Sequence, residues 1–376
     1  MARLVVYAIG GNALSSPTSS DKKESALVLA KVLSDVIDLL EGGWRVILTH
    51  GNGPQVGRLL TLDTENDQGM DAWVAATQGM IGHELSIHLD SILYKRQRPE
   101  RTAVVLTRVE VAADDSAFEL PSKPVGPILS NDAVFANEWD VAETIHGPRR
   151  VVSSPKPVNV LDLDVISKLV DLRAVVICGG GGGIPVIRHL DEWVGIPAVI
   201  DKDRLSALLA LKLEADALII STAVDALKTD FGSDNEVSHP CMSVEVAKGF
   251  LAKGQFPSGS MGPKVSSLID AVEKSPSIKA IICQPGDAIA ALRGDAGTTI
   301  GVVKLGTNSA SVSELKNNEN IQIYPNPSNG QVNISLSNNA ISPERIDVLD
   351  IYGKIIIQEN NFNNSLTDVL DLSSLP

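Results

Sequence analysis

Three lysines lie where an ammonium group could neutralise phosphate oxygens. Lys202 stands between two aspartates, the second of which is Asp203, directly after an apolar stretch. Lys264 closes a loop rich in glycine and serine, residues 254–264, that leads into a predicted helix, and anions bind at helix starts. Lys123 lies between two prolines in a stiff segment. These residues predict phosphate chemistry, although the GxxxxGK(S/T) pattern of a P-loop is absent from the sequence.

Glycine-rich turns that follow predicted strands are the second element of this chemistry. Five consecutive glycines, 179–183, come directly after the apolar run 174–178. The turns at 10–12 and 51–53 each follow an earlier strand and combine glycine with asparagine. Glycine permits positive φ and close approach to the main chain, so N–H groups of such loops can face an anion or a carboxylate. A surface turn with a local ion pair is the alternative interpretation of the five-glycine stretch.

Alternating apolar strands and amphipathic helices predict the scaffold that positions these loops. Strands are expected at 4–9, 45–49, 102–107, 174–178, 197–200, 217–222, 279–283 and 298–303. Helices are expected at 22–40, 72–94, 204–214, 243–249, 265–273 and 288–292. This order is typical of βαβ units around a parallel sheet, in which the carboxyl ends of the strands share one edge. The predicted fold class is therefore α/β with a mostly parallel central sheet.

Residues 110–157 interrupt this pattern. Proline and glycine cluster in LPSKPVGPIL and HGPRRVVSSPKPV, and no strong periodicity runs through the segment. A stretch of this length predicts an inserted subdomain or a lid over the site. The segment contains Lys123, so we expect the lid to bring that lysine to the other two.

The composition excludes several classes of protein. The chain is 44% hydrophobic and 21% charged, which is ordinary for a globular protein. A net charge of −14 argues against a general basic face for nucleic acid, but a few lysines can still form a positive cleft. The three cysteines show no C-x-x-C spacing and the six histidines no metal-ligand spacing, so no metal site built from protein residues is predicted. No signal peptide or membrane-spanning helix is expected.

The composition changes beyond about residue 305. Residues 306–376 hold 13 of the chain's 20 asparagines. Short strands are expected at 321–327, 331–336, 345–351 and 354–358, with turn residues between them. We therefore predict a main domain at 1–305, a polar linker at 306–319 and a small β-rich module at 320–376.

Eight motifs, taken in order, resemble those of the carbamate kinases of the amino acid kinase superfamily. They are AIGGNAL at 8–14, HGNGPQVG at 50–57, TQGMIG at 77–82, SKPVGP at 122–127, VVSSPKP at 151–157, GGGGIPVI at 180–187, AVIDKD at 198–203 and GSMGPKV at 259–265. The resemblance covers residues 3 to about 304. It implies a three-layer αβα sandwich, a protruding subdomain at about 110–157, and a homodimer.

The resemblance also implies an activity. ATP and carbamate would interconvert with ADP and carbamoyl phosphate, with Mg²⁺ on the nucleotide phosphates, in a reaction often run toward ATP synthesis. Because carbamate itself attacks the phosphorus, the reaction needs positioning and charge stabilisation but no protein nucleophile. A cytoplasmic enzyme of arginine breakdown or of purine nitrogen use, with no nucleic-acid or membrane partner, is the expected setting.

Carried onto this sequence, the motifs of the family assign three groups of residues. Neutralising and orienting the phosphates would fall to Lys123, Lys202, Asp203 and Lys264. Binding the carbamoyl and phosphoryl groups would fall to Gly10, Gly11, Asn12, Gly51, Asn52, Gly53, Gly180 and Gly181. The nucleotide side would include Asp225, Phe231, Ser260, Met261, Gly262 and Lys264.

The tail resembles a different family. IYPNPSNGQVNISL, IDVLDIYGKII and LDLSSLP are similar to the type A C-terminal sorting domain of proteins exported by the type IX secretion system. The resemblance stops at Pro376, where that family normally continues with further strands. We therefore expect a truncated, fused or artificial C-terminus without catalytic relevance, and a genuine fusion is the rival hypothesis.

Three alternatives come from other functional classes. A kinase of the same fold could act on another small carboxylate or a phosphonate, against which the KPVG and SMGPK motifs argue. A non-catalytic nucleotide-binding regulator would not need to keep three lysines together. A surface or adhesion protein is suggested by the tail alone.

Overall fold

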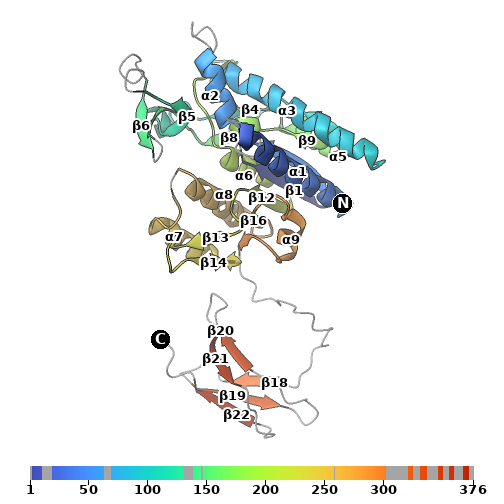
Figure 1. Cartoon of the computed structure of the whole chain (residues 1–376), viewed down its shortest axis with the longest axis vertical. Helices are drawn as coiled ribbons and strands as arrows, with labels where there is room; N and C mark the ends of the chain where they lie inside the picture. The colour runs from blue at the N-terminus through green and yellow to red at the C-terminus, as the bar shows by residue number, and fades with distance from the viewer. Residues whose placement is uncertain are drawn as a thin grey trace. The chain divides into compact units, whose positions relative to one another are not determined.

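The computed structural model (Figure 1) describes most of the main domain and the strands of the tail. The residues described are 2–10, 19–62, 69–130, 139–144, 147–257, 259–301, 321–324, 331–336, 346–349, 355–359 and 367–371. The chain forms two compact units, Met1–Val303 and Lys304–Pro376. Each unit is described by itself below.

An eight-stranded sheet forms the centre of the first unit, in the order β15-β17-β16-β12-β1-β2-β9-β3. The strands are β15 (Cys241–Met242), β17 (Thr298–Ile300), β16 (Lys279–Cys283), β12 (Ala217–Ser221), β1 (Leu4–Ile9), β2 (Arg45–His50), β9 (Val175–Ile177) and β3 (Thr102–Val104). The β16–β17 pair is antiparallel and the other neighbouring pairs are parallel. The loops that leave β1, β2, β9 and β12 therefore share one edge, as predicted.

Two layers of helices cover the sheet (Figure 1), which confirms the three-layer αβα sandwich. One layer holds α1 (Ser19–Glu41), α3 (Met70–Lys95) and α9 (Ala288–Arg293). The other holds α5 (Leu163–Asp171), α6 (Lys202–Lys212), α7 (Val244–Ala252) and α8 (Met261–Lys274). In β1, Tyr7 packs into the first layer and Val6 into the second, because successive strand residues point to opposite faces.

The segment expected to be an irregular lid contains an antiparallel sheet of three strands. These are β5 (Lys123–Ile128), β7 (Gly147–Val152) and β6 (Val141–Thr144), in the order β5-β7-β6. The sheet protrudes beside α2 (Gly53–Leu62), which contacts β5 (Figure 1). A second small sheet, β11-β10-β4-β8, consists of Glu192–Gly195, Ile184–His189, Arg108–Val111 and Pro157–Val160. Prolines in β5 and β8 interrupt the alternation by which strands are recognised in a sequence.

Two predicted elements near the lysines are corrected by the structure. The strand predicted at 197–200 is wrong, because these residues form no strand, although 198–200 are buried. Val199 instead donates its backbone N–H to the carbonyl of Ser153 at 3.0 Å. Helix α8 begins at Met261 rather than at 265, so Lys264 lies within the first turn of the helix and not in the loop before it.

Five strands are described in the second unit. An antiparallel sheet is formed by β18 (Ile321–Tyr324), β19 (Gln331–Leu336) and β22 (Thr367–Asp371), and a separate hairpin by β20 (Ile346–Leu349) and β21 (Ile355–Glu359). Four of these strands fall on predicted ones, and β22 was not predicted. Within the described parts of the chain, no helix has the length and apolar character needed to cross a membrane.

Candidate active site

Two lysines from different helices meet on one buried carboxylate. The Nζ of Lys202 lies 2.5 Å from Oδ1 of Asp203, and the Nζ of Lys264 lies 2.9 Å from Oδ2. Lys202 is the first residue of α6 and Lys264 lies in the first turn of α8, and these helices pack against each other. Because the two oxygens of Asp203 each hold one ammonium group, the carboxylate fixes the spacing between the two cations.

The electrostatics of this cluster favour an anionic ligand. Burial raises the pKa of the Asp203 carboxyl, but the Lys202 and Lys264 ammonium groups outweigh burial and hold that pKa below its usual range. Burial lowers the pKa of Lys202, and the charge of Asp203 opposes this shift. Two cations thus share one anion at the starts of two helices, where the helix dipoles also favour negative charge.

The third predicted lysine reaches the same turn from the lid. The Nζ of Lys123 donates to the carbonyl of Ile200 at 3.0 Å and to Oδ2 of Asp201 at 3.2 Å. Asp201 also caps α6, because its Oδ1 accepts the backbone N–H of Asp203 at 2.9 Å. Burial raises the pKa of Asp201, but the charges of Lys123 and Lys202 dominate and push it well below the usual range. The Asp-Lys-Asp turn therefore brings all three predicted lysines together.

The five-glycine loop is packed against the end of β2 and against the Asp-Lys-Asp turn. A Cβ on Gly180 would lie 2.4 Å from the His50 ring, and one on Gly181 would lie 2.1 Å from the side-chain nitrogen of Asn52. Gly182, at φ +93°, lies against the carbonyl of Ile200. Only glycine fits these positions. The loop thus connects the loop after β2 to the Asp-Lys-Asp turn, and its predicted anion-binding role at Gly180 and Gly181 stays a prediction.

The five-glycine loop is held in place by side chains for which the sequence analysis predicted no role. Gln78 of α3 donates to the carbonyl of Gly180 at 3.0 Å and accepts the backbone N–H of Thr107 at 2.8 Å. The hydroxyl of Thr107 accepts the N–H of Gly179 at 2.8 Å. Gln78 lies in the TQGMIG motif, but the motif gives no sign that its side chain supports a loop about one hundred residues later in the sequence.

The predicted carbamoyl-binding residues lie at the carboxyl edge of the sheet where they are described. Gly10 directly follows β1, the N–H of Gly51 donates to the carbonyl of Ile9 at 3.1 Å, and Gly53 begins α2. The side-chain amide of Asn52 is 2% exposed and donates to Thr77 Oγ1 at 2.9 Å, so α3 fixes its position. Gly11 and Asn12 lie outside the described residues.

His50, the last residue of β2, is a supporting residue. Its Nδ1 lies 3.0 Å from the carbonyl of Gly51 and its side chain is buried against Gly180. Burial lowers the pKa of His50 to about 4, so the ring is neutral at neutral pH. A neutral ring leaves the positive charge of the site to the lysines.

Two loops carry the predicted nucleotide-binding residues. Ser260, Met261 and Gly262 form the start of α8, next to Lys264. Phe231 is 68% exposed and follows β13 (Leu227–Thr229), which pairs with β14 (Val237–His239). The loops are joined because Gln255 accepts the backbone N–H of Asp230 at 2.7 Å and donates to its carboxylate at 2.9 Å. No role was predicted for Gln255.

Asp225, also predicted on the nucleotide side, has a different environment from the lysine cluster. Its carboxylate pairs with Lys228 at 3.3 Å. It lines a hollow of about 380 Å³ together with Asp287 and Asp295. Three carboxylates repel phosphate, so a contact of Asp225 with a nucleotide would involve an uncharged part of that ligand.

The site residues fit a metal ion that is bound mainly by substrate phosphates. In the described parts of the chain, no group of three or more His, Cys, Asp or Glu side chains is placed to hold a metal. The carboxylates beside the lysines, Asp201 and Asp203, already accept hydrogen bonds from ammonium groups. Mg²⁺ in kinases keeps several waters and binds through phosphates with few protein ligands, which agrees with this arrangement.

Comparison with known proteins assigns the class first. The family model described as the amino acid kinase family matches residues 3–284, and the mostly parallel sheet of this domain is consistent with the fold of that family. A second family model, the secretion system C-terminal sorting domain, matches residues 322–376. The tail resemblance is therefore confirmed alongside that of the main domain.

Individual relatives identify the family within this class. The carbamate kinase of Staphylococcus haemolyticus is 38% identical over 309 residues, which cover 79% of this chain and 98% of the relative. That of Halobacterium salinarum is 38% identical over 304 residues, covering 78% and 97%. The structure of carbamate kinase from Giardia lamblia bound to AMP-PNP matches with a TM-score of 0.71 at 31% identity, covering 80% and 98%. The chain belongs to the carbamate kinase family.

Proposed function

We propose that this chain catalyses reversible phosphoryl transfer between ATP and carbamate, giving ADP and carbamoyl phosphate. The convergence of Lys123, Lys202 and Lys264 on one Asp-Lys-Asp turn carries the proposal. The three lysines come from the lid, α6 and α8, so three separate parts of the fold deliver one cation each. Such an arrangement suits a transition state whose charge is spread over several phosphate oxygens.

In the direction of ATP synthesis, an oxygen of the β-phosphate of ADP attacks the phosphorus of carbamoyl phosphate. The bond between phosphorus and the carbamate oxygen breaks, and carbamate leaves with the electron pair. Lys123, Lys202 and Lys264 would neutralise the phosphate oxygens, and Asp203 would hold two of the lysines at a fixed spacing. Backbone amides at Gly10 and at 51–53 would hold the carbamoyl oxygens.

We place the nucleotide at the start of α8, beside Ser260, Met261 and Gly262. Phe231 offers an exposed aromatic surface from the neighbouring loop, which suits an adenine ring. Mg²⁺ held by the nucleotide phosphates would supply further neutralisation of their charge. Asp203 would keep its hydrogen bonds to the lysines throughout.

A homodimer is proposed through the face formed by α3 and β3. Met80, Ile87 and Tyr94 of α3 follow one another at seven-residue spacing and are 57%, 51% and 79% exposed. Helix α3 contacts β3, the edge strand of the sheet, where Val104 is 40% exposed. An apolar stripe beside an open sheet edge is typical of an interface between copies.

Sedimentation of the full chain tests the dimer. Ile87→Asp should shift the protein toward the monomer, because it places a charge in the middle of the stripe. Val237→Asp, on a half-exposed position of β14, should leave the association unchanged. A wild-type protein that sediments as a monomer at micromolar concentration would contradict the proposal.

We propose further that the enzyme works in the cytoplasm, where its nucleotide substrates are found, and that arginine breakdown is one setting. The sorting-domain tail points to export instead, so the two parts of the chain suggest different locations. Fractionation of the source cells with an antibody to the kinase domain decides between them. Kinase found mainly outside the cytoplasm would overturn this proposal and support a genuine fusion.

The activity is tested with the purified full chain, Mg²⁺, ADP and carbamoyl phosphate, by following ATP formation. Acetyl phosphate and other acyl phosphates serve as competing substrates. We expect rapid ATP formation from carbamoyl phosphate that is lost in Lys264→Met but kept in Lys274→Met, at the other end of the same helix. No ATP above the spontaneous breakdown of carbamoyl phosphate, from a folded protein that binds ADP, would favour another substrate or a regulatory role.

A further inference from the structure

The lid meets the body of the kinase at two glycines. Gly57 lies in α2, and Gly126 lies in β5, three residues after Lys123. A Cβ on Gly57 would lie 2.4 Å from Cα and 2.5 Å from the backbone nitrogen of Gly126. Both atoms belong to the main chain, so the clash could not be relieved by the rotation of a flexible side chain. The two segments approach this closely only because Gly57 has no side chain.

The conformation of the lid presents Gly126 to α2. The pairing of β5 with β7 shifts register between Pro124 and Ile128, and Gly126 lies in this irregularity at φ +72°. The carbonyl of Gly126 accepts two hydrogen bonds from the Arg149 side chain of β7, from Nε at 3.1 Å and from Nη2 at 2.6 Å. Arg149 therefore holds the main chain of β5 at the point of contact.

Buried side chains continue the contact on either side of the glycines. Val56 and Val125, which directly precede the two glycines, belong to one apolar cluster and are 0% and 1% exposed. Val152, which pairs with Lys123 across β5 and β7, belongs to the same cluster. The strand that carries Lys123 is thus packed as one unit with the seam, by which we mean Val56, Gly57, Val125 and Gly126.

We propose that Gly57 and Gly126 are positioning residues, whose backbone contact sets how deeply the lid presents Lys123 to the phosphates. Helix α2 begins at Gly53, the last residue of the segment 51–53 that is proposed to hold the carbamoyl group. The seam therefore fixes Lys123 relative to that loop. The inference rests on the proposed kinase activity and adds two residues that no phosphate needs to touch.

The distances give the size of the effect. Ordinary contacts of a Cβ begin at 3.4 Å, whereas a methyl group on Gly57 would start at 2.4 Å, so the seam would have to open by about 1 Å. A misplacement of about 1 Å at a reacting group can cost about 10²-fold in rate. Nucleotide affinity should change little, since Lys202 and Lys264 lie on α6 and α8 and not on the lid.

The test is steady-state kinetics of ATP formation by the full chain carrying Gly57→Ala. We expect kcat to fall by about 10-fold to 100-fold while the KM for ADP stays within about twofold. Gly249→Ala is the matched control, because Gly249 is also a helical glycine but has no atom within 4 Å of its Cβ position. The control should keep both constants. A folded Gly57→Ala protein with wild-type kcat, or with ADP affinity lost in proportion to kcat, would overturn the inference.

Two further variants separate positioning from general damage. Arg149→Met frees the carbonyl of Gly126 without adding bulk to the seam, and it should lower kcat in the same direction by less. In a Lys123→Met background, Gly57→Ala should leave the residual rate unchanged, because its effect acts through that lysine. Additive losses would overturn the inference. A wild-type chain that makes no ATP would instead reject the proposed activity, which keeps the two failures distinct.

Discussion

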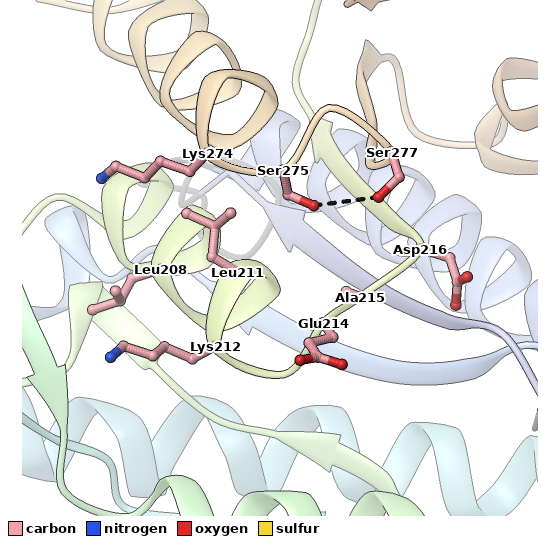
Figure 2. A pocket seen from close by; sticks show the side chains of 9 residues that line it. All are labelled: Leu208, Leu211, Lys212, Glu214, Ala215, Asp216, Lys274, Ser275 and Ser277. Atoms are coloured by element: carbon pink, nitrogen blue, oxygen red, sulfur yellow. Dashed lines mark hydrogen bonds between the residues drawn. The ribbon is translucent and has the colours of Figure 1, made fainter.

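Helices α6 and α8 each carry a lysine at both ends, and the two pairs of lysines have opposite environments. At the starts of the helices, Lys202 and Lys264 share the buried carboxylate of Asp203. At the ends, Lys212 and Lys274 are exposed and line a hollow of about 630 Å³ (Figure 2). One residue type on the same pair of helices thus lies in the proposed reactive centre at one edge of the sheet and on an ordinary solvated surface at the other.

The helix dipole explains why the two pairs of lysines need different environments. An ammonium group stabilises the last turn of a helix but opposes the dipole in the first turn. Lys212 and Lys274 therefore follow the local rule, and Figure 2 shows their side chains extending away from the carboxylates of Glu214 and Asp216. Lys202 and Lys264 break this rule, and the negative charge of Asp203 compensates for their unfavourable interaction with the helix dipoles. Residues that break a local rule at a recognisable cost are expected where function requires them.

The largest effect should come from removing the compensating charge. Asp203→Asn leaves two lysines without their shared anion, and breaking a buried pair in this way costs about 3–5 kcal/mol of unfolding free energy. ATP formation should be lost as well, because the spacing of the lysines is no longer fixed. Urea unfolding followed by circular dichroism measures the stability.

The matched substitution at the other edge is Glu214→Gln. This exposed residue should change the free energy of unfolding by less than about 0.5 kcal/mol. Equal losses for Asp203→Asn and Glu214→Gln would show that the two edges do not differ in the way proposed.

The next effect is on rate. Lys202→Met and Lys264→Met should each lower kcat by about 10²–10³, the usual cost of losing one preorganised group that stabilises developing charge. Stability should fall much less than in Asp203→Asn, because one lysine still neutralises the carboxylate. Single-turnover measurements of ATP formation with saturating ADP isolate this step. Retention of more than a tenth of the wild-type rate in both variants would contradict the assignment of these lysines.

A smaller effect concerns acid stability at Asp201. A carboxyl whose pKa is depressed by folding contributes stability that is present above its unfolded pKa and lost as pH falls through the folded value. Asp201→Asn keeps a good helix cap but removes the charge that pairs with Lys123, at a cost of about 1 kcal/mol near neutral pH. The difference from wild type should stay constant down to about pH 5 and shrink below about pH 4.

Urea unfolding at a series of pH values measures this difference. If it widened as the pH fell, the sign would be opposite to the one expected from a depressed pKa. Such a result would mean that folding favours the protonated carboxyl of Asp201, so that its pairing with Lys123 does not stabilise the fold.

The candidate site lysines and the parallel sheet could be predicted from the sequence because both leave local signals. Apolar runs mark buried strands, and charged groups directly after a strand mark the carboxyl edge. The same signal failed at 197–200, because an apolar run reports burial and not whether a backbone finds a strand to pair with. In β5, two prolines concealed a strand.

The supporting contacts of the site could not be predicted for a related reason. Gln78 holds Gly180 across about one hundred residues, and Gly57 meets Gly126 across about seventy. Local patterns fix which elements form, whereas contacts of this kind depend on how the elements pack. Asp201 could be read as a helix cap, but its pairing with Lys123 depends on where the lid lies.

The smallest effects are expected at the far ends of the two helices. Lys212→Met and Lys274→Met each remove a favourable charge from a last helical turn, which should lower the free energy of unfolding by about 0.3–1 kcal/mol at low salt. The loss should fade in high salt, because exposed charges are screened. The value of kcat should stay within about twofold of wild type, since the hollow lies at the edge of the sheet opposite to the lysine cluster. A tenfold fall in kcat in a folded Lys274→Met protein would mean that α8 transmits changes from its end to Lys264. The two edges would then act as one functional unit rather than as a reactive centre and a solvated surface.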